Sequence, residues 1–158
     1  MKSLVVYYSF SGNTKEVAQM LHDVLSQRGV CDLYELKPKD ESTNFFIQAN
    51  RAFCKARARL DKAPYDVCYY DLICVGTPVW AFGPAPAVNT YLEGIIKLEG
   101  KDALCFMTYG SGLGANLCIE KMKKALKTKG AFKLFSFGIQ QGRADDKSFV
   151  KEQIVKYV

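Results

Sequence analysis

Polar side chains and a glycine follow directly after the first apolar run of the sequence, Leu4 to Tyr8. This first segment comprises Ser9, Phe10, Ser11, Gly12, Asn13 and Thr14, and apolar residues at helical spacing begin at Val17. A helix N-terminus offers unpaired N–H groups and the positive end of the helix dipole. Neutral hydroxyl and amide donors at such an end suit a phosphate dianion, so we expect an anion site here. The simpler alternative is that Ser11 or Asn13 only caps the helix. The spacing of a Walker A loop is absent.

A second segment joins the only tryptophan of the chain to prolines and a glycine. It runs from Gly76 to Pro86 and contains Thr77, Pro78, Val79, Trp80, Ala81, Phe82 and Gly83. The prolines stiffen a loop, and Gly83 permits a backbone angle that other residues avoid. An aromatic pair usually packs in a core. A tryptophan in such a loop after a strand is nevertheless well placed to cover a planar ligand, and we expect Trp80 to do so.

A third segment is rich in small residues, which let the backbone approach a ligand closely. It contains Thr108, Tyr109, Gly110, Ser111, Gly112 and Gly114. Gly110, Gly112 and Ala115 also match the GxGxxA dinucleotide fingerprint. That fingerprint belongs after the first strand and requires an acidic residue about 20 positions later. Residues 132–138 contain no acid, so we do not expect a Rossmann-type nicotinamide site.

Apolar runs rich in β-forming residues alternate with segments of helical spacing. The runs lie at 3–8, 31–36, 69–75, 103–108 and 134–139, and the helical stripes lie at 17–25, 45–60, 88–95, 115–126 and 149–154. This alternation predicts an α/β three-layer sandwich, in which a five-stranded parallel sheet is covered by helices on both faces. Gly29 and Gly130 follow helical stripes, where C-terminal caps belong. Because ligands bind at the carboxyl ends of such strands, the three segments should meet there.

Composition favours one domain, residues 1–158, in the cytoplasm. A chain of 158 residues with 49% hydrophobic residues can bury a core without disulfides. We expect no membrane partner, because no apolar run approaches the ~20 residues that span a bilayer. The N-terminal apolar run is too short for a signal peptide. The six cysteines show no CxxC spacing, which favours reduced thiols, and a single histidine argues against a metal site.

The chain is basic, with a formal net charge of +6. The plainest interpretation is a solvated basic surface. The alternative is a face that attracts an acidic protein, an anionic substrate or nucleic acid. No zinc-finger or RNA-binding motif accompanies the lysines and arginines, so we expect no nucleic-acid partner.

The three segments together resemble the flavodoxin family. Residues 9–14 are similar to its phosphate loop, [ST]-x-[ST]-G-x-T, and the second and third segments look like its two ring-binding loops. The resemblance covers essentially the whole chain, and it implies a flavodoxin-like sheet with strand order 2-1-3-4-5 and a non-covalent FMN cofactor. It implies that Ser9, Ser11, Asn13 and Thr14, with the amides of Phe10 and Gly12, bind the phosphate. It places Thr77 and Pro78 near the ribityl chain and ring edge, Val79, Trp80, Ala81, Phe82 and Gly83 along the isoalloxazine, and Thr108, Tyr109, Gly110, Ser111 and Gly114 on its other side.

The resemblance also implies a function, namely electron transfer through FMN to a redox protein partner or a small electron acceptor, by a monomer or homodimer. The first alternative is an NAD(P)H-dependent quinone or FMN reductase, since a basic surface would attract NAD(P)H. The second is a non-catalytic flavin-binding module. The chain departs from the family in its charge of +6, because the electron carriers of this family are typically acidic. A basic surround favours the reduced, negatively charged cofactor. A second departure is the stretch 42–64, which we interpret as a basic helix before the third strand.

Overall fold

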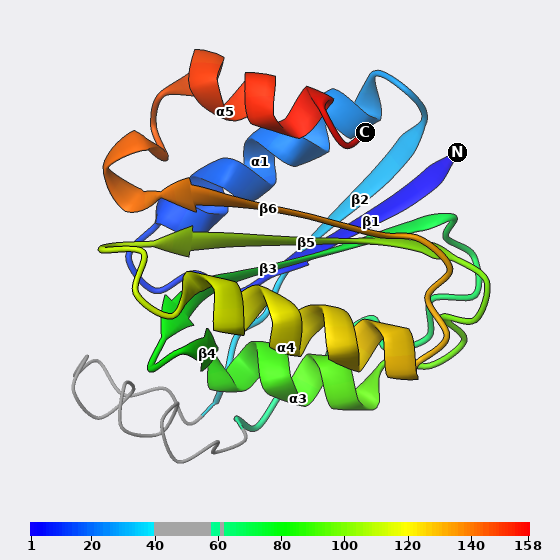
Figure 1. Ribbon diagram of the computed structural model, residues 1–158. Coiled ribbons are helices and arrows are strands. Elements are labelled where there is room, and N and C mark those ends of the chain that lie inside the picture. The colour runs from blue at the N-terminus through cyan, green and yellow to red at the C-terminus, as the bar shows by residue number, and fades with distance from the viewer. Residues whose placement is uncertain (40–57, 61) are drawn as a thin grey trace.

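A parallel sheet covered by helices on both faces forms the centre of the computed structural model, which describes residues 1–39, 58–60 and 62–158 (Figure 1). The long strands are β1 (Lys2–Tyr7), β2 (Val30–Glu35), β3 (Leu72–Trp80), β5 (Asp102–Tyr109) and β6 (Leu134–Gln140). They lie in the order β2-β1-β3-β5-β6, and every neighbouring pair is parallel. Counted along the chain without the short β4 (Gly83–Pro84), this is the predicted order 2-1-3-4-5. The predicted α/β three-layer architecture is therefore confirmed.

Within residues 1–39, 58–60 and 62–158, four helices form the two outer layers. Helices α1 (Asn13–Ser26) and α5 (Lys147–Val155) cover one face of the sheet, and α3 (Pro86–Gly94) and α4 (Ala115–Thr128) cover the other (Figure 1). Alternate strand residues point to opposite faces. Val5 accordingly packs in the buried cluster beneath α1 and α5, while Val6 packs in the one beneath α3 and α4. Burial on both faces explains why the central strands β1, β3 and β5 read as nearly continuous apolar runs.

Strand β3 differs from its prediction, and the difference matters for the site. The predicted strand ended at residue 75, whereas β3 continues to Trp80. Gly76, Thr77 and Pro78 pair with β5, and Val79 and Trp80 pair with the antiparallel β4. The stretch predicted as one loop is therefore mostly a strand. Prolines are unusual inside a sheet, so the sequence indicated a loop where β3 continues.

A two-residue turn joins β3 to β4. Ala81 and Phe82 have φ angles of 44° and 64°, the left-handed region that hairpin turns of this length require and that non-glycine residues rarely occupy. The prediction that Gly83 supplies the unusual angle was wrong, because the two residues before it do so. The backbone is thus strained beside the carboxyl edge of the sheet.

The helix ends also differ in part from the predictions. The N-cap of α1 is Gly12, with a φ of 94° and no side-chain cap, rather than Ser11 or Asn13. Gly130, with a φ of 89°, follows α4 as predicted. Gly29 follows α1 without serving as its C-cap, which is Gln27. A Cβ atom at Gly29 would lie 2.1 Å from the Met1 carbonyl oxygen, so close packing requires glycine there.

Most of the predicted basic helix at 42–64 lies outside the described residues. In the part of this stretch that the structure describes, Leu60 forms an antiparallel bridge with Pro38 and is not helical. Within the described part of the chain, none of the helices has the length and apolar character needed to cross a bilayer.

Candidate functional site

A cavity of about 440 Å³ lies at the carboxyl edge of the sheet, where β1, β3 and β5 end. It is lined by Phe10, Ser11, Pro78, Val79, Trp80, Tyr109, Gly110, Ser111, Gly112, Leu113 and Gln141. The fold thus brings all three predicted segments together in one place. None of these described lining residues carries a charged side chain, so the cavity suits an uncharged ring better than an ion.

The first segment forms the turn into α1. The Ser9 hydroxyl accepts a hydrogen bond from the Lys15 amide at 3.2 Å, and the Asn13 side-chain amide donates to Ser11 Oγ at 3.1 Å. Open space surrounds the position that a Cβ atom would take at Gly12. Helix geometry leaves the first amides of α1 without an acceptor inside the helix. These hydroxyl and amide donors fit a phosphate group beside the cavity.

Thr14 lies deeper than its predicted role suggests. It is 1% exposed, and its hydroxyl bonds at 2.8 Å to that of Thr108, which is 0% exposed. The pair ties the start of α1 to the end of β5 across the sheet. The exposed or half-buried side chains of Ser9, Ser11 and Asn13 are therefore more accessible to a ligand than that of Thr14.

We predict that Thr14→Val destabilises the fold by about 1–3 kcal/mol, because it leaves the buried Thr108 hydroxyl without its partner. The double variant Thr14→Val/Thr108→Val should recover much of this loss, because both partners are then apolar. Urea unfolding of the single and double variants measures the coupling. Strictly additive losses would show that the two hydroxyls do not stabilise one another.

Trp80 forms a wall of the cavity and is itself packed. Its ring meets those of Tyr8 and Phe10 edge to face, with centroids 5.5 Å apart in both pairs. Only 5% of Trp80 is exposed. Core packing and cavity lining, the two interpretations of this residue, therefore coexist.

Ten of the predicted site residues do not line this cavity. These are Ser9, Gly12, Asn13, Thr14, Thr77, Ala81, Phe82, Gly83, Thr108 and Gly114. The buried Thr77 hydroxyl accepts from the Ala85 amide at 2.9 Å and so holds the turn into α3. A Cβ atom at Gly114 would lie 2.4 Å from Phe82 Cδ1, so this glycine lets the third segment pack on the hairpin.

Gly112, Leu113 and Gln141 line the cavity but were absent from the predicted binding set. Gln141 begins the short helix η1 (Gln141–Arg143), directly after β6. Its neighbour Gln140 donates to the Gly110 carbonyl at 3.3 Å and so braces the third segment. Its position in the chain could have indicated that Gln141 lies at the site, because the end of the last parallel strand reaches the same edge of the sheet. Tyr109 and Gly112 also border a second cavity of about 320 Å³.

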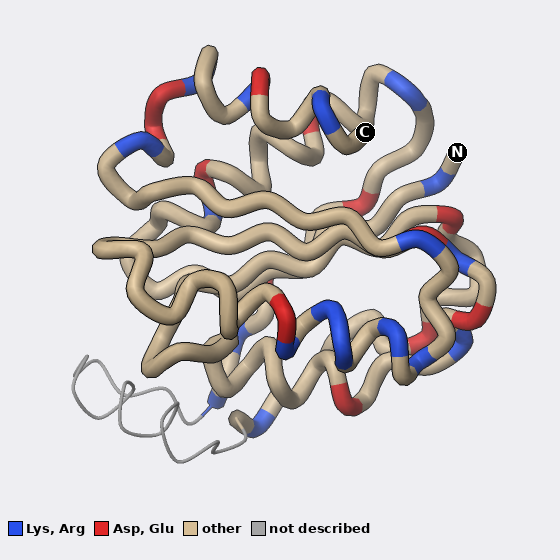
Figure 2. Tube along the Cα trace, viewed as in Figure 1, with Lys and Arg blue, Asp and Glu red and all other residues tan. Residues whose placement is uncertain are grey.

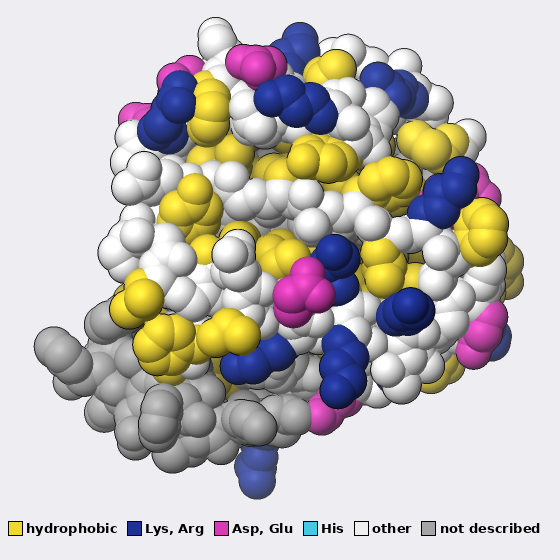
Figure 3. Space-filling view, in the orientation of Figure 1, with side chains coloured by type: hydrophobic (Ala, Val, Ile, Leu, Met, Phe, Trp, Pro, Cys, Tyr) yellow, Lys and Arg dark blue, Asp and Glu magenta, His cyan; other side chains and the backbone are white. Residues whose placement is uncertain are grey.

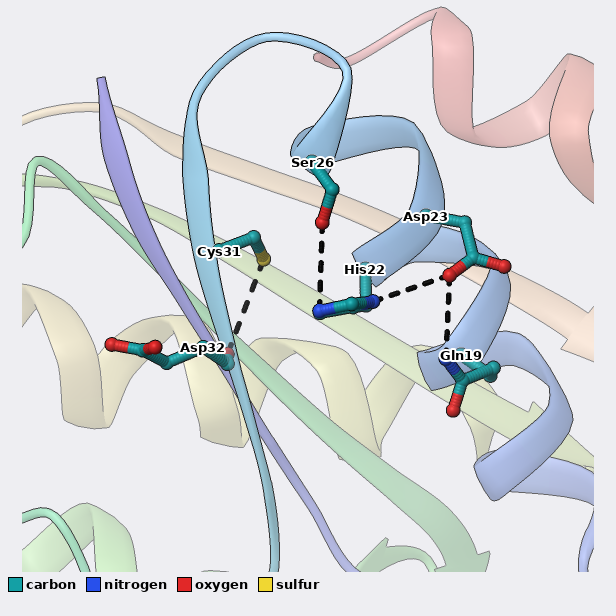
Figure 4. Close-up of polar contacts among 6 residues, drawn as sticks. All are labelled: Gln19, His22, Asp23, Ser26, Cys31 and Asp32. Atoms are coloured by element: carbon teal, nitrogen blue, oxygen red, sulfur yellow. Dashed lines mark hydrogen bonds and ion pairs between the residues drawn. The ribbon is translucent and has the colours of Figure 1, made fainter.

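A separate polar cluster on α1 has the residue types of a hydrolytic triad (Figure 4). His22 lies 3.4 Å from Ser26 Oγ through Nε2 and 3.2 Å from Asp23 Oδ1 through Nδ1. All three residues come from one helix, and none lines the cavity. Nearby, burial and then Asp32 raise the pKa of Cys31 to about 11, so its thiol is not a ready nucleophile. We therefore assign these contacts to the helix surface.

Comparison with known proteins supports the flavin-binding interpretation of this site. The family model for flavodoxin matches residues 2–157. None of the curated proteins matches the chain. Among solved structures, a flavoprotein from Lactobacillus acidophilus in complex with FMN is 23% identical, with a TM-score of 0.66, over 93% of this chain and 98% of that one. A flavoprotein from Bacteroides eggerthii is 24% identical, with a TM-score of 0.72, over 98% and 96%.

An NADH:FMN oxidoreductase is also similar, at 18% identity and a TM-score of 0.67, over 98% of this chain and 87% of that one. At such identities the likeness between structures shows the fold alone. The family match, by contrast, extends over nearly the whole sequence. The chain belongs to the flavodoxin family.

Proposed function

We propose that the chain transfers electrons between redox partners through FMN held at the carboxyl edge of the sheet. The observation that carries this proposal is a cavity of about 440 Å³, whose described lining residues are uncharged, beside a turn of neutral donors at the start of α1. Membership of the flavodoxin family supports FMN as the cofactor, as does the FMN in the similar Lactobacillus flavoprotein.

The chain's own residues bind and orient the cofactor. Ser9, Ser11 and Asn13, with the first amides of α1, hold the phosphate, and the Thr14–Thr108 bond keeps this turn fixed against β5. The ring would be held by cavity-lining residues of the second and third segments, namely Val79 and Trp80 together with Tyr109, Gly110 and Ser111. FMN supplies the redox chemistry when bound. The protein needs only to bind it and to exclude water from it.

A second candidate is an NAD(P)H-dependent reductase, favoured by the net charge of +6, since NAD(P)H is anionic. Rapid mixing of the FMN-loaded protein with NADH or NADPH separates the two functions. An electron carrier should keep its flavin absorption band on this time scale and lose it on photoreduction. Fast bleaching by either nucleotide would instead establish the reductase. A protein that takes up no FMN would refute both.

The cytoplasmic location stays part of this proposal. Cys31, Cys68, Cys74, Cys105 and Cys118 are free thiols, as expected in a reducing compartment. Burial raises the pKa of Cys105 and of Cys118 to about 12. These two thiols therefore stay protonated and pack as small apolar groups.

A further inference from the structure

Large apolar side chains are exposed beside the cavity. Phe82 is 42% exposed, Leu113 is 74% exposed and Leu117 is 57% exposed. Figure 3 shows hydrophobic side chains gathered over β4 and the start of α4. Leu113 also lines the cavity, and Phe82 lies against Gly114. This apolar patch therefore adjoins the place proposed for the flavin ring.

The turn that presents Phe82 is strained and held in place. Phe82 has a φ of 64°, a backbone conformation that is strained in a non-glycine residue. Lys121 Nζ donates to the Phe82 carbonyl at 2.8 Å and so links the turn to α4. The fold thus keeps an aromatic side chain at the surface although a glycine would fit this turn more easily.

Positively charged lysine side chains border the patch. Helix α4 carries four lysines and one acidic residue, Glu120, which pairs with Lys123 at 3.4 Å. Among the described residues, no carboxylate lies within ion-pair distance of Lys121, Lys124 or Lys127. Leu117, Lys121 and Lys124 lie at i, i+4 and i+7, and therefore on one side of the helix. Figure 2 shows the lysines spread along α4.

We propose that this apolar–lysine face, formed by Phe82, Leu113, Leu117, Lys121, Lys124 and Lys127, docks an acidic electron-transfer protein with its redox centre beside the cavity. The inference rests on the proposed function, because the partner exchanges electrons with FMN. The lysines steer an acidic surface toward the face, and the apolar side chains supply the buried centre of the contact. A second copy of the chain is a poor occupant, since it would bring lysines against lysines.

The test uses the FMN-loaded protein and two probes of opposite charge built on the same protein. One is cytochrome c, which is basic, and the other is succinylated cytochrome c, whose lysine amines are converted to amides that end in a carboxylate. Calorimetry measures binding, and stopped-flow absorbance measures electron transfer from the photoreduced protein. The succinylated probe should bind and be reduced at least about tenfold better than the basic one at low salt. This advantage should shrink as salt rises through about 0.1 M.

Matched variants locate the contact. Lys124→Glu/Lys127→Glu should weaken binding of the succinylated probe by about tenfold or more. Lys147→Glu/Lys151→Glu makes the same charge change on α5, on the opposite face of the sheet, and should weaken it by about twofold at most. Leu117→Gln should weaken binding by about fivefold at low and at high salt alike, because the lost contact is apolar.

Equal effects of the α4 and α5 pairs would overturn the proposal, since net charge alone would then explain the binding. So would equal binding of the two probes. Self-association, or binding to anionic vesicles, that the α4 pair abolishes while probe binding persists would assign the face to another occupant. FMN affinity is measured first for every protein. Intact FMN binding without probe docking refutes only this inference, whereas loss of FMN from the unaltered chain refutes the proposed function and this inference with it.

Discussion

Ser11→Asp should lower the affinity for FMN by about a hundredfold or more, while the protein stays folded. It removes a donor to a charged group, worth about 1.5–3 kcal/mol. It also places a carboxylate beside the phosphate, where repulsion at 4 Å costs about 1 kcal/mol per charge pair in water and more near protein. Ser11 is exposed, and an anion before the start of α1 favours the helix. Thermal unfolding of the FMN-free variant should therefore occur at or above the temperature for the unaltered protein.

Riboflavin, which lacks the phosphate, provides the control for this substitution. Its affinity should be nearly the same for the Ser11→Asp variant and the unaltered protein, because only the phosphate meets the new charge. Ser11→Ala should lower FMN affinity by about tenfold, from the lost donor alone. If Ser11→Asp weakened riboflavin and FMN equally, the phosphate would lie elsewhere.

Gly76→Ala should destabilise the fold by about 3 kcal/mol, the upper end of ordinary overpacking costs. A Cβ atom at Gly76 would lie 2.1 Å from Cζ of Phe106, its partner across β3 and β5. Phe106 is fully buried and stacks on Phe137 with centroids 5.8 Å apart, so moving its ring would disturb the packing of the buried cluster. The carbonyl oxygen of Gly76 also accepts a hydrogen bond from the Tyr8 amide at 3.1 Å. We therefore expect weaker FMN binding as well, measured together with urea unfolding.

The reason for this loss can be checked with a second substitution. In a Phe106→Leu background, Gly76→Ala should cost about 1 kcal/mol, because the smaller side chain leaves room for the new methyl group. Gly142→Ala is the matched control, since open space surrounds that position, and it should change stability by less than about 0.5 kcal/mol. An unchanged cost in the Phe106→Leu background would mean that the ring is not the obstacle.

The sequence predicted the layered fold well because its central strands β1, β3 and β5 are buried on both faces. Runs such as the one around Val5 and Val6 are apolar at every position, and helical stripes such as the one containing Leu21 and Leu25 separate them. The end of β3 could not be predicted in the same way. Pro78 lies inside the sheet against Thr108, and the turn places positive φ angles on Ala81 and Phe82 although Gly83 follows them. Local preferences point the other way at each of these positions.

The site was predictable to the extent that it depends on topology. Parallel strands end at one edge, so the segments after β1, β3 and β5 had to meet there. Which side chain reaches the cavity depends instead on packing, as the buried Thr14 and the half-buried Gln141 show. Gln141 follows β6, which corresponds to the last of the five predicted strands, and it carries no motif of its own. The exposure of Leu113 likewise depends on the loop conformation, and no spacing pattern in the sequence predicts it.

We propose that uncharged donors in residues 9–14 hold the FMN phosphate as a dianion. This proposal is tested by following the ³¹P resonance of FMN bound to the protein as a function of pH. A free phosphate monoester takes up a proton near pH 6. Donors that favour the charged form lower the pKa of the phosphate, so the bound resonance should stay at its dianion position down to about pH 5. A bound resonance that titrates like that of free FMN would contradict the account.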